Sequence, residues 1–110
     1  EIASALNNLG ELLEEMNDYK NAEPLLRQAL KIDEKVLGEN NPGIVPDLSN
    51  LAALLRHEYD FCGARQLLER AIAIDESSRG LDDPQTRELR QDLTILLKNE
   101  ADANIPTKCP

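Results

Sequence analysis

The side chains that could do chemistry in this chain are mainly carboxylates, and three of them are closely spaced. Glu14 and Glu15 follow Glu11 by three and four residues, so all three share one face if this stretch is helical. There they could pair with lysines or arginines of a ligand, each exposed pair contributing about 0.2 to 1 kcal/mol. A solvated face in an acidic protein explains the same spacing. The pattern does not pair carboxylates across a cleft, as glycoside hydrolysis requires, so it favours binding over catalysis.

The histidine and the cysteines offer little for catalysis or metal binding. His57 is the only histidine, and Cys62 and Cys109 lack the spacing of metal ligands. Cys62 lies near the start of a predicted helix, whose N-terminus would lower the thiol pKa, and it could pair with His57. A half-exposed filler position explains Cys62 more simply. The sequence also lacks a glycine-flanked serine and a phosphate-binding glycine loop, so we expect no enzyme activity, no cofactor and no metal.

Composition and charge restrict the partners. The 110 residues carry a formal net charge of -9, which argues against binding to nucleic acid or an anionic membrane, since both need a basic surface. No apolar run approaches the roughly 20 residues of a membrane-spanning helix, although a leader could precede this sequence. Two cysteines are too few for a disulfide framework, so we expect a reducing compartment and a cytoplasmic location.

A stretch of the chain, residues 6–42, occurs a second time as residues 48–84. The residues that return 42 positions later include Asn8 as Asn50, Leu9 as Leu51, Leu13 as Leu55, Asp18 as Asp60, Ala22 as Ala64, Leu26 as Leu68, Ala29 as Ala71, Gly38 as Gly80 and Pro42 as Pro84. Such a period is the signature of a solenoid, in which each unit buries its apolar face against a neighbour. With only 3% aromatic residues, the core must be built from leucine, isoleucine and alanine, which favours an all-α fold.

Apolar residues recur at three and four positions in five stretches, which predicts helices over 2–16, 19–37, 46–57, 61–78 and 84–101. Asp18 and Asp60 precede the second and fourth helices and are expected to cap them. Gly38 and Gly80 are expected to end these helices in the left-handed conformation. Pro46 would remove a backbone bond inside a helix, so the third helix either begins there or has a kinked first turn.

The repeated unit resembles the tetratricopeptide repeat, in which two antiparallel helices form each unit. The resemblance rests on a small residue at Gly10, alanines at Ala22 and Ala29 and an aromatic residue at Tyr19. The 42-residue version, with the segment YKNAEPLL at 19–26, is similar to the kinesin light chain type. The resemblance implies a right-handed helical solenoid that acts as a scaffold or adaptor and binds a protein or peptide on its concave face.

The resemblance also assigns that concave face, because the first helix of each unit lines it. Keeping the register gives the partner-binding candidates Asn7, Glu11, Glu14, Glu15, Ser49, Arg56, His57, Gln91 and Lys98. We expect this face to be acidic at its N-terminal end, mildly basic toward its C-terminal end, and suited to a partner with a basic segment. Arg56 and His57 could receive a carboxylate, but a favourable interaction with the helix dipole explains a basic residue there equally well.

The presence of two asparagines in the first predicted helix needs an explanation, since asparagine is a poor helix former. We expect Asn7 to face the groove, where its amide could bond a ligand's backbone. Asn8 returns as Asn50, and we expect this pair to bond between adjacent helices.

The repeat predicts one helical domain over 1–101, with units of about 1–42 and 43–83, a capping helix over 84–101 and a flexible tail over 102–110. Arg90 stands where Leu48 packs, which suggests that nothing stacks beyond the last helix. The chain starts just after a repeat boundary, so we expect upstream repeats to be missing.

A rival interpretation is structural. The segment could cap a longer array, or form a homodimer through the apolar edge of its first helix. It could also regulate an enzymatic domain upstream.

Overall fold

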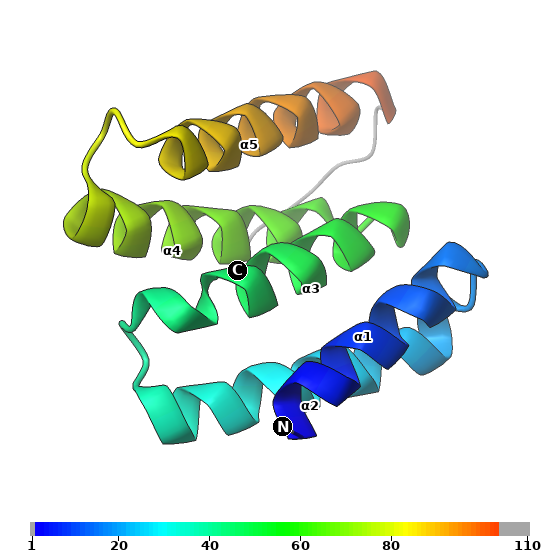
Figure 1. Ribbon diagram of the computed structural model, residues 1–110. Helices are drawn as coiled ribbons and strands as arrows, with labels where there is room; N and C mark the ends of the chain where they lie inside the picture. Colours follow the sequence, from blue (N-terminus) through cyan, green and yellow to red (C-terminus); the bar gives the residue numbers. More distant parts are fainter. Residues whose placement is uncertain (1, 104–110) are drawn as a thin grey trace.

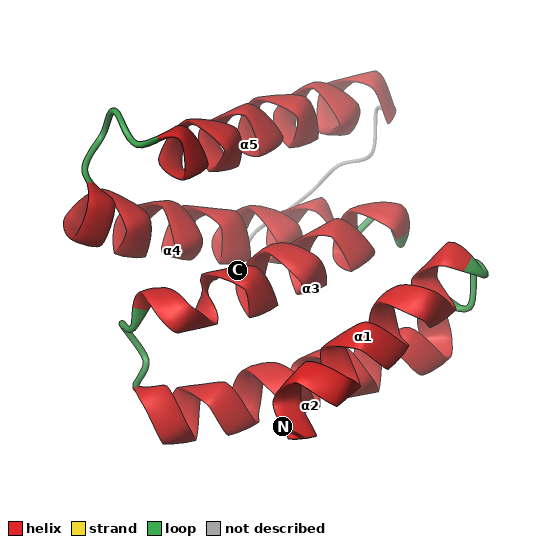
Figure 2. Ribbon diagram, in the orientation of Figure 1, coloured by secondary structure: helices red, strands yellow, loops and turns green. Residues whose placement is uncertain are grey.

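The computed structural model describes residues 2–103, which form an all-helical array (Figure 1). Its elements are α1 (Ile2–Glu15), α2 (Tyr19–Leu37), the 3-10 helix η1 (Pro42–Ile44), α3 (Val45–His57), α4 (Phe61–Arg79) and α5 (Pro84–Ala103). Figure 2 shows helices and loops but no strand among these residues. The predicted all-α solenoid is therefore confirmed, and every predicted helix end lies within two residues of the observed one.

The C-terminal prediction needs a correction. Residues 102 and 103 belong to α5, so the helix continues past the point where we expected the tail to start. The remainder of that predicted tail, residues 104–110, lies outside the described residues, and so does Cys109.

Consecutive helices pack side by side (Figure 1). The closest pairs are α1 with α2 and α3 with α4, while α3 also packs against α2, and α5 packs against α4. A side chain at Gly10 would require Leu26 to move, because an added Cβ would come within 2.6 Å of Leu26 Cδ2. The glycine therefore lets α1 and α2 approach closely.

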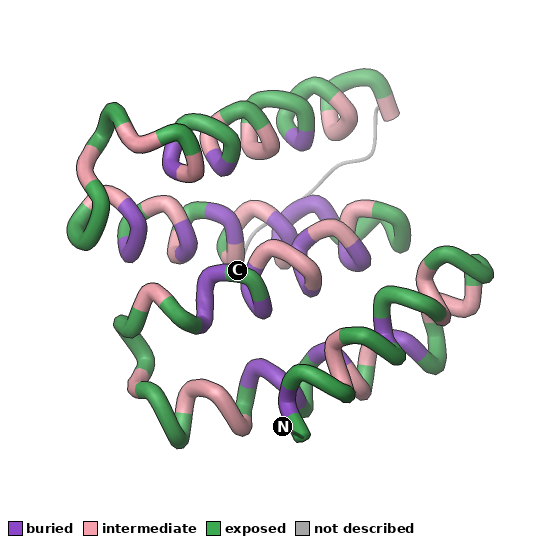
Figure 3. The backbone as a smooth tube through the Cα atoms, in the orientation of Figure 1, coloured by how far each residue is buried: buried purple, intermediate pink, exposed green. Residues whose placement is uncertain are grey.

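The core is centred on α3 (Figure 3). Ile44, Leu51 and Leu54 are almost fully buried, with exposed fractions of 0%, 1% and 0%. The residues 42 positions earlier are Ile2, Leu9 and Leu12, and they are 71%, 47% and 51% exposed. The row on α3 is buried because α2 precedes it, whereas no described helix precedes α1. We call Ile2, Leu9, Leu12 and Met16 the α1 row.

The turns inside each helix pair follow one geometry. Asn17 and Tyr59 have positive φ angles of 62° and 65°, and the next amide in each case donates back, from Asp18 to the carbonyl of Leu13 and from Asp60 to that of Leu55. This is the hydrogen-bond pattern of a left-handed helix end. The left-handed residues, Asn17 and Tyr59, therefore lie in the turns that follow α1 and α3, the first helix of each pair.

The predicted caps are correct in part. The Asp60 carboxylate accepts from the backbone amide of Gly63 at 3.0 Å, as expected. Asp18 makes no side-chain cap bond, and its carboxylate accepts instead from the side-chain amide of Asn21 at 2.8 Å. Gly38 and Gly80 have φ angles of 105° and 91° with ψ angles of 153° and 167°. They end α2 and α4 as predicted, but their ψ angles are extended rather than those of a left-handed helix.

The position of Pro46 is settled by η1. This short 3-10 turn carries the chain into α3, which begins at Val45, so that Pro46 is its second residue. Backbone amides of the first helical turn have no helical acceptor, and the missing N–H of proline therefore removes no bond.

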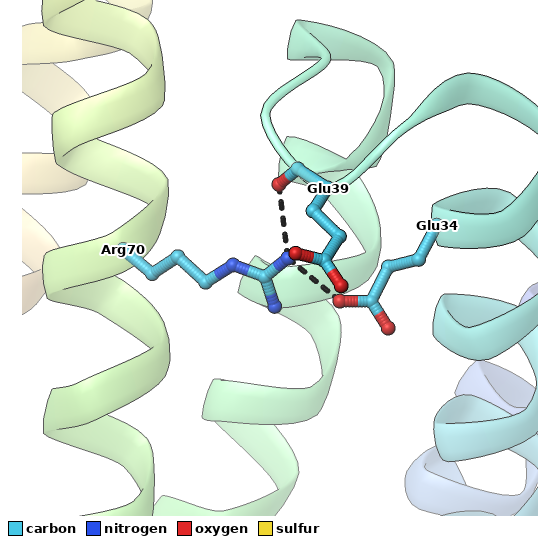
Figure 4. A network of polar contacts seen from close by, with 3 residues as sticks. All are labelled: Glu34, Glu39 and Arg70. Carbon is cyan, nitrogen blue, oxygen red and sulfur yellow. Dashed lines mark hydrogen bonds and ion pairs between the residues drawn. The ribbon is translucent and has the colours of Figure 1, made fainter.

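Polar contacts join the successive units. Arg70 of α4 donates to Glu34 Oε2 of α2 at 2.6 Å and to the carbonyl oxygen of Glu39 at 2.9 Å (Figure 4). Arg90 of α5 bonds to Glu76 of α4, which is the repeat equivalent of Glu34. Arg90 thus has a partner within the array, and the expectation that nothing stacks beyond α5 stays a prediction.

A second polar contact joins α1 to α3, and it corrects the roles expected for the two asparagines. Asn7 donates its amide to Asp47, while Asn8 is exposed. The residue that bonds between helices is thus Asn7. Asp47 is only 2% exposed, and burial, followed by the neighbouring carboxyl of Asp33, raises its pKa from the ordinary 3.8 to about 7.

We expect the two equivalent leucines to respond differently to truncation. Leu54→Ala should lower the free energy of unfolding by about 2 to 5 kcal/mol, because it leaves a cavity in the core, whereas Leu12→Ala should cost less than about 1 kcal/mol. Urea denaturation followed by circular dichroism measures both. Equal losses would mean that the α1 row is covered in solution.

The raised pKa of Asp47 predicts that the stability of the fold depends on pH. A carboxyl whose pKa is raised by folding stabilises the fold while protonated, so this contribution is present below about pH 4 and is lost as the pH rises through about 7. Asp47→Asn keeps the acceptor for Asn7 without the charge, and it should stabilise the fold at pH 8 by at least about 1 kcal/mol. The advantage should shrink toward pH 4. A difference between the two proteins that stays constant from pH 4 to pH 8 would contradict this.

Candidate functional site

A groove lies between α3 and α5, above α4. Its middle part is lined by Ser49, Ala52, Ala53, Arg56, Leu68, Asp92 and Leu96. One end, which shares Ser49 and Asp92, adds Pro46, Pro84, Gln85, Glu88 and Leu89. The other end, which shares Arg56, adds His57, Tyr59, Phe61, Asn99, Asp102 and Ala103. We call this set the α3–α5 groove. It exists because α3 and α5 both pack on α4.

The middle of the groove combines an apolar floor with a charged rim. Ala52, Leu68 and Leu96 are buried, with exposed fractions of 2%, 5% and 1%, and they enclose a hollow of about 100 Å³. Arg56 and Asp92 are partly exposed at its edge. A floor of this kind can bind an apolar side chain while the rim holds polar or charged groups.

The charge of the groove differs from our expectation. Its α5 side carries Glu88, Asp92 and Asp102, while Lys98 lines none of the described hollows. The expected mildly basic C-terminal end is therefore wrong, because the lysine lies on a different face of α5 from the carboxylates. Burial, and then Glu88, raises the pKa of Asp92, and only Arg56 opposes this.

A second hollow lies where α1 and α3 end. It is lined by Glu11, Glu14, Glu15, Asn17, Tyr19, Asn50 and His57. The His57 ring stacks on Tyr19, with 5.3 Å between the centroids, and His57 Nε2 lies 3.6 Å from Glu14 Oε2. Burial is the main cause that raises the pKa of Glu14, and the charge of His57 lowers it. The three glutamates do share one surface, and His57 closes one side of it.

The predicted site residues divide into those that line a hollow and those that do not. Ser49 and Arg56 lie in the α3–α5 groove, His57 lies in both hollows, and the three glutamates lie in the second. Asn7 is engaged by Asp47. Gln91 and Lys98 are exposed on α5.

Asp92 was not singled out from the sequence, although a signal was there. Asn8, Asn50 and Asp92 are each 42 residues apart and so occupy equivalent positions of the repeat. The first two carry a neutral amide side chain, whereas the third carries a carboxylate. A change of charge at a repeated position distinguishes one groove from its neighbour.

Cys62 corrects another expectation. It is 9% exposed and disulfide-bonded rather than a half-exposed thiol. A sulfur in a disulfide is not a thiolate, so the pairing with His57 as a nucleophile does not form in this state. A disulfide also persists in oxidising compartments, and the cytoplasmic location therefore stays a prediction.

Within residues 2–103, no cluster of three or more histidine, cysteine, aspartate or glutamate side chains is arranged to hold a metal ion. In the same part of the chain, no helix has the length and apolar character needed to cross a membrane.

Comparison with known proteins agrees with the helix-pair architecture. The family model described as Tetratricopeptide repeat matches residues 1–77, which covers the first four helices almost completely. No curated protein matches the chain. Because the match extends over more than half of the sequence, and the helices pair and stack in units of 42 residues, the chain belongs to the tetratricopeptide repeat family.

Proposed function

We propose that this chain is a protein-interaction module that binds a segment of a partner protein along the α3–α5 groove, which forms part of a concave face. The observation that carries the proposal is the hollow of about 100 Å³ that combines apolar residues with Ser49, Arg56 and Asp92. Membership of the repeat family supports a protein partner, since stacked repeats create extended binding surfaces. The resemblance to the kinesin light chain type, and a role as scaffold or adaptor, belong to this proposal.

We propose direct partner contacts for the predicted residues that line a hollow. These are Glu11, Glu14, Glu15, Ser49, Arg56 and His57. Gln91 and Lys98 are included as exposed neighbours on α5. Asn7 acts instead by holding α1 against α3 through Asp47. The unit limits of about 1–42 and 43–83, with 84–101 as a cap, are part of the same proposal.

Selection from a displayed library of random dodecapeptides tests the binding role. A selected peptide should lose about tenfold in affinity for a variant with Glu11, Arg56 and Gln91 changed to Ala, because polar contacts of about 0.5 to 1.5 kcal/mol each together reach the roughly 1.4 kcal/mol of a tenfold change. Isothermal titration calorimetry measures the affinity. Asn7 is left unchanged because its removal would leave the buried Asp47 without its donor.

The matched control changes Gln28, Lys31 and Lys35 to Ala, three exposed residues of α2 that line neither hollow. It should bind the selected peptide within twofold of the native chain. If both triple variants bind as tightly as the native chain, the proposed contacts of Glu11, Arg56 and Gln91 with the partner are wrong.

The α1 row favours a second candidate function, self-association. Leu9 and Leu12 are about half exposed at positions whose repeat equivalents are fully buried, and Met16 is 66% exposed. Exposed apolar rows of this kind mark interaction surfaces. A homodimer through α1, or stacking within a longer array, would cover them.

The mass in solution separates the two candidates. A binding module should sediment as a 12.3 kDa monomer, and Leu12→Glu should leave both its mass and its peptide affinity unchanged. Analytical ultracentrifugation measures the mass. A dimer that Leu12→Glu converts to monomer would instead support self-association through the α1 row.

A further inference from the structure

The α3–α5 groove carries information about the chemistry of its ligand. Glu88 and Asp92 lie one helical turn apart on α5 and both line the groove. Neither forms an ion pair or a hydrogen bond with any residue of the described range 2–103. Across the two hollows, six carboxylates face a single guanidinium, that of Arg56.

Building on the proposed function, we propose that the α3–α5 groove selects an extended peptide segment with an aliphatic side chain and, two positions away, a lysine or arginine. The aliphatic side chain enters the hollow over Ala52, Ala53, Leu68 and Leu96, and the basic side chain lies between Glu88 and Asp92.

The size and lining of the middle hollow specify the aliphatic anchor. Its volume is about 100 Å³, smaller than the cavity of about 150 Å³ that accepts a benzene ring. Ala52, Leu68 and Leu96 offer no polar atom of their side chains to a ligand. One aliphatic side chain fits the small volume and matches these apolar lining residues.

The two-residue spacing follows from the geometry of an extended chain. Side chains at positions i and i+2 point to the same side and lie roughly 7 Å apart. Asp92 lines both the middle hollow and the adjoining end with Glu88, so a cation placed there is next to the anchor. On the opposite rim, the Arg56 guanidinium can donate to a backbone carbonyl of the ligand.

Electrostatics favour a cation at this place. Burial and the charge of Glu88 both raise the pKa of Asp92, and the charge of Arg56, on the same hollow, opposes this only in part. A bound ammonium or guanidinium group supplies further compensation. An acidic ligand would add to the repulsion.

The repeat supplies substitutions that the fold already accepts at equivalent positions. Asp92→Asn places on α5 the residue that stands at Asn50, and it removes only the charge. Ala53→Ile places on α3 the residue that stands at Ile95 of α5, and it fills the hollow. Glu69→Gln, on an exposed part of α4 outside the groove, is the matched control.

An array of acetylated, amidated octapeptides of random sequence tests the proposal. Peptides retained by the native chain should be enriched in an aliphatic residue with lysine or arginine two positions away. The strongest of them, measured by fluorescence polarisation, should bind about tenfold more weakly to Asp92→Asn and to Ala53→Ile and unchanged to Glu69→Gln. Circular dichroism confirms that the three variants remain folded.

The outcomes distinguish this inference from the proposed function. Retained peptides that lack this motif, bind both variants normally and yet are lost with the triple alanine variant at Glu11, Arg56 and Gln91 would overturn the ligand chemistry only. If no octapeptide is retained, or if retained peptides ignore the triple variant as well, both the ligand chemistry and the binding role are wrong.

Discussion

The burial of one apolar row against the preceding helix is the constraint on which this structure depends. That row consists of Ile44 of η1 with Leu51 and Leu54 of α3; it is almost fully buried, and α2 packs against both elements. Because α3 is held on one side by α2 and on the other by α4, its remaining face is left to form the surface. The α5 helix repeats this arrangement on α4. The groove between α3 and α5 is thus a consequence of stacking, and its chemistry depends on the side chains at positions that stacking leaves unburied.

Polar contacts between units add selectivity to this apolar stacking. Arg70 ties α4 to Glu34 and to the loop after α2, and Arg90 ties α5 to Glu76, so the same glutamate position is used at two successive interfaces. The Asn7 contact with Asp47 adds a buried link between α1 and α3. A buried carboxyl is costly to ionise, and burial together with the neighbouring Asp33 raises the pKa of Asp47.

Most of the fold could be predicted from the sequence because its determinants are local. The spacing of leucines, the glycines at 38 and 80 and the proline at 84 set the helix ends within two residues. The candidate site was predicted less well, because the direction of a side chain depends on the rotation of one helix against another. A difference of one residue separates Asn7, which bonds to Asp47, from the exposed Asn8. The same effect places Asp92 in the groove and Lys98 outside it. The disulfide at Cys62 could not be predicted either, since the residues around Cys62 carry no spacing signal for a disulfide.

The central claim is that a partner segment lies in the α3–α5 groove. Nuclear magnetic resonance of the nitrogen-15-labelled chain, titrated with a selected peptide, tests this most directly, because each backbone amide reports its own surroundings. We predict that the largest chemical-shift changes occur at the amides of Ser49, Ala53, Arg56 and Asp92. The chemical shifts of Lys31 and Glu69 should stay the same. Changes confined to α2 and the outer face of α4 would contradict the account.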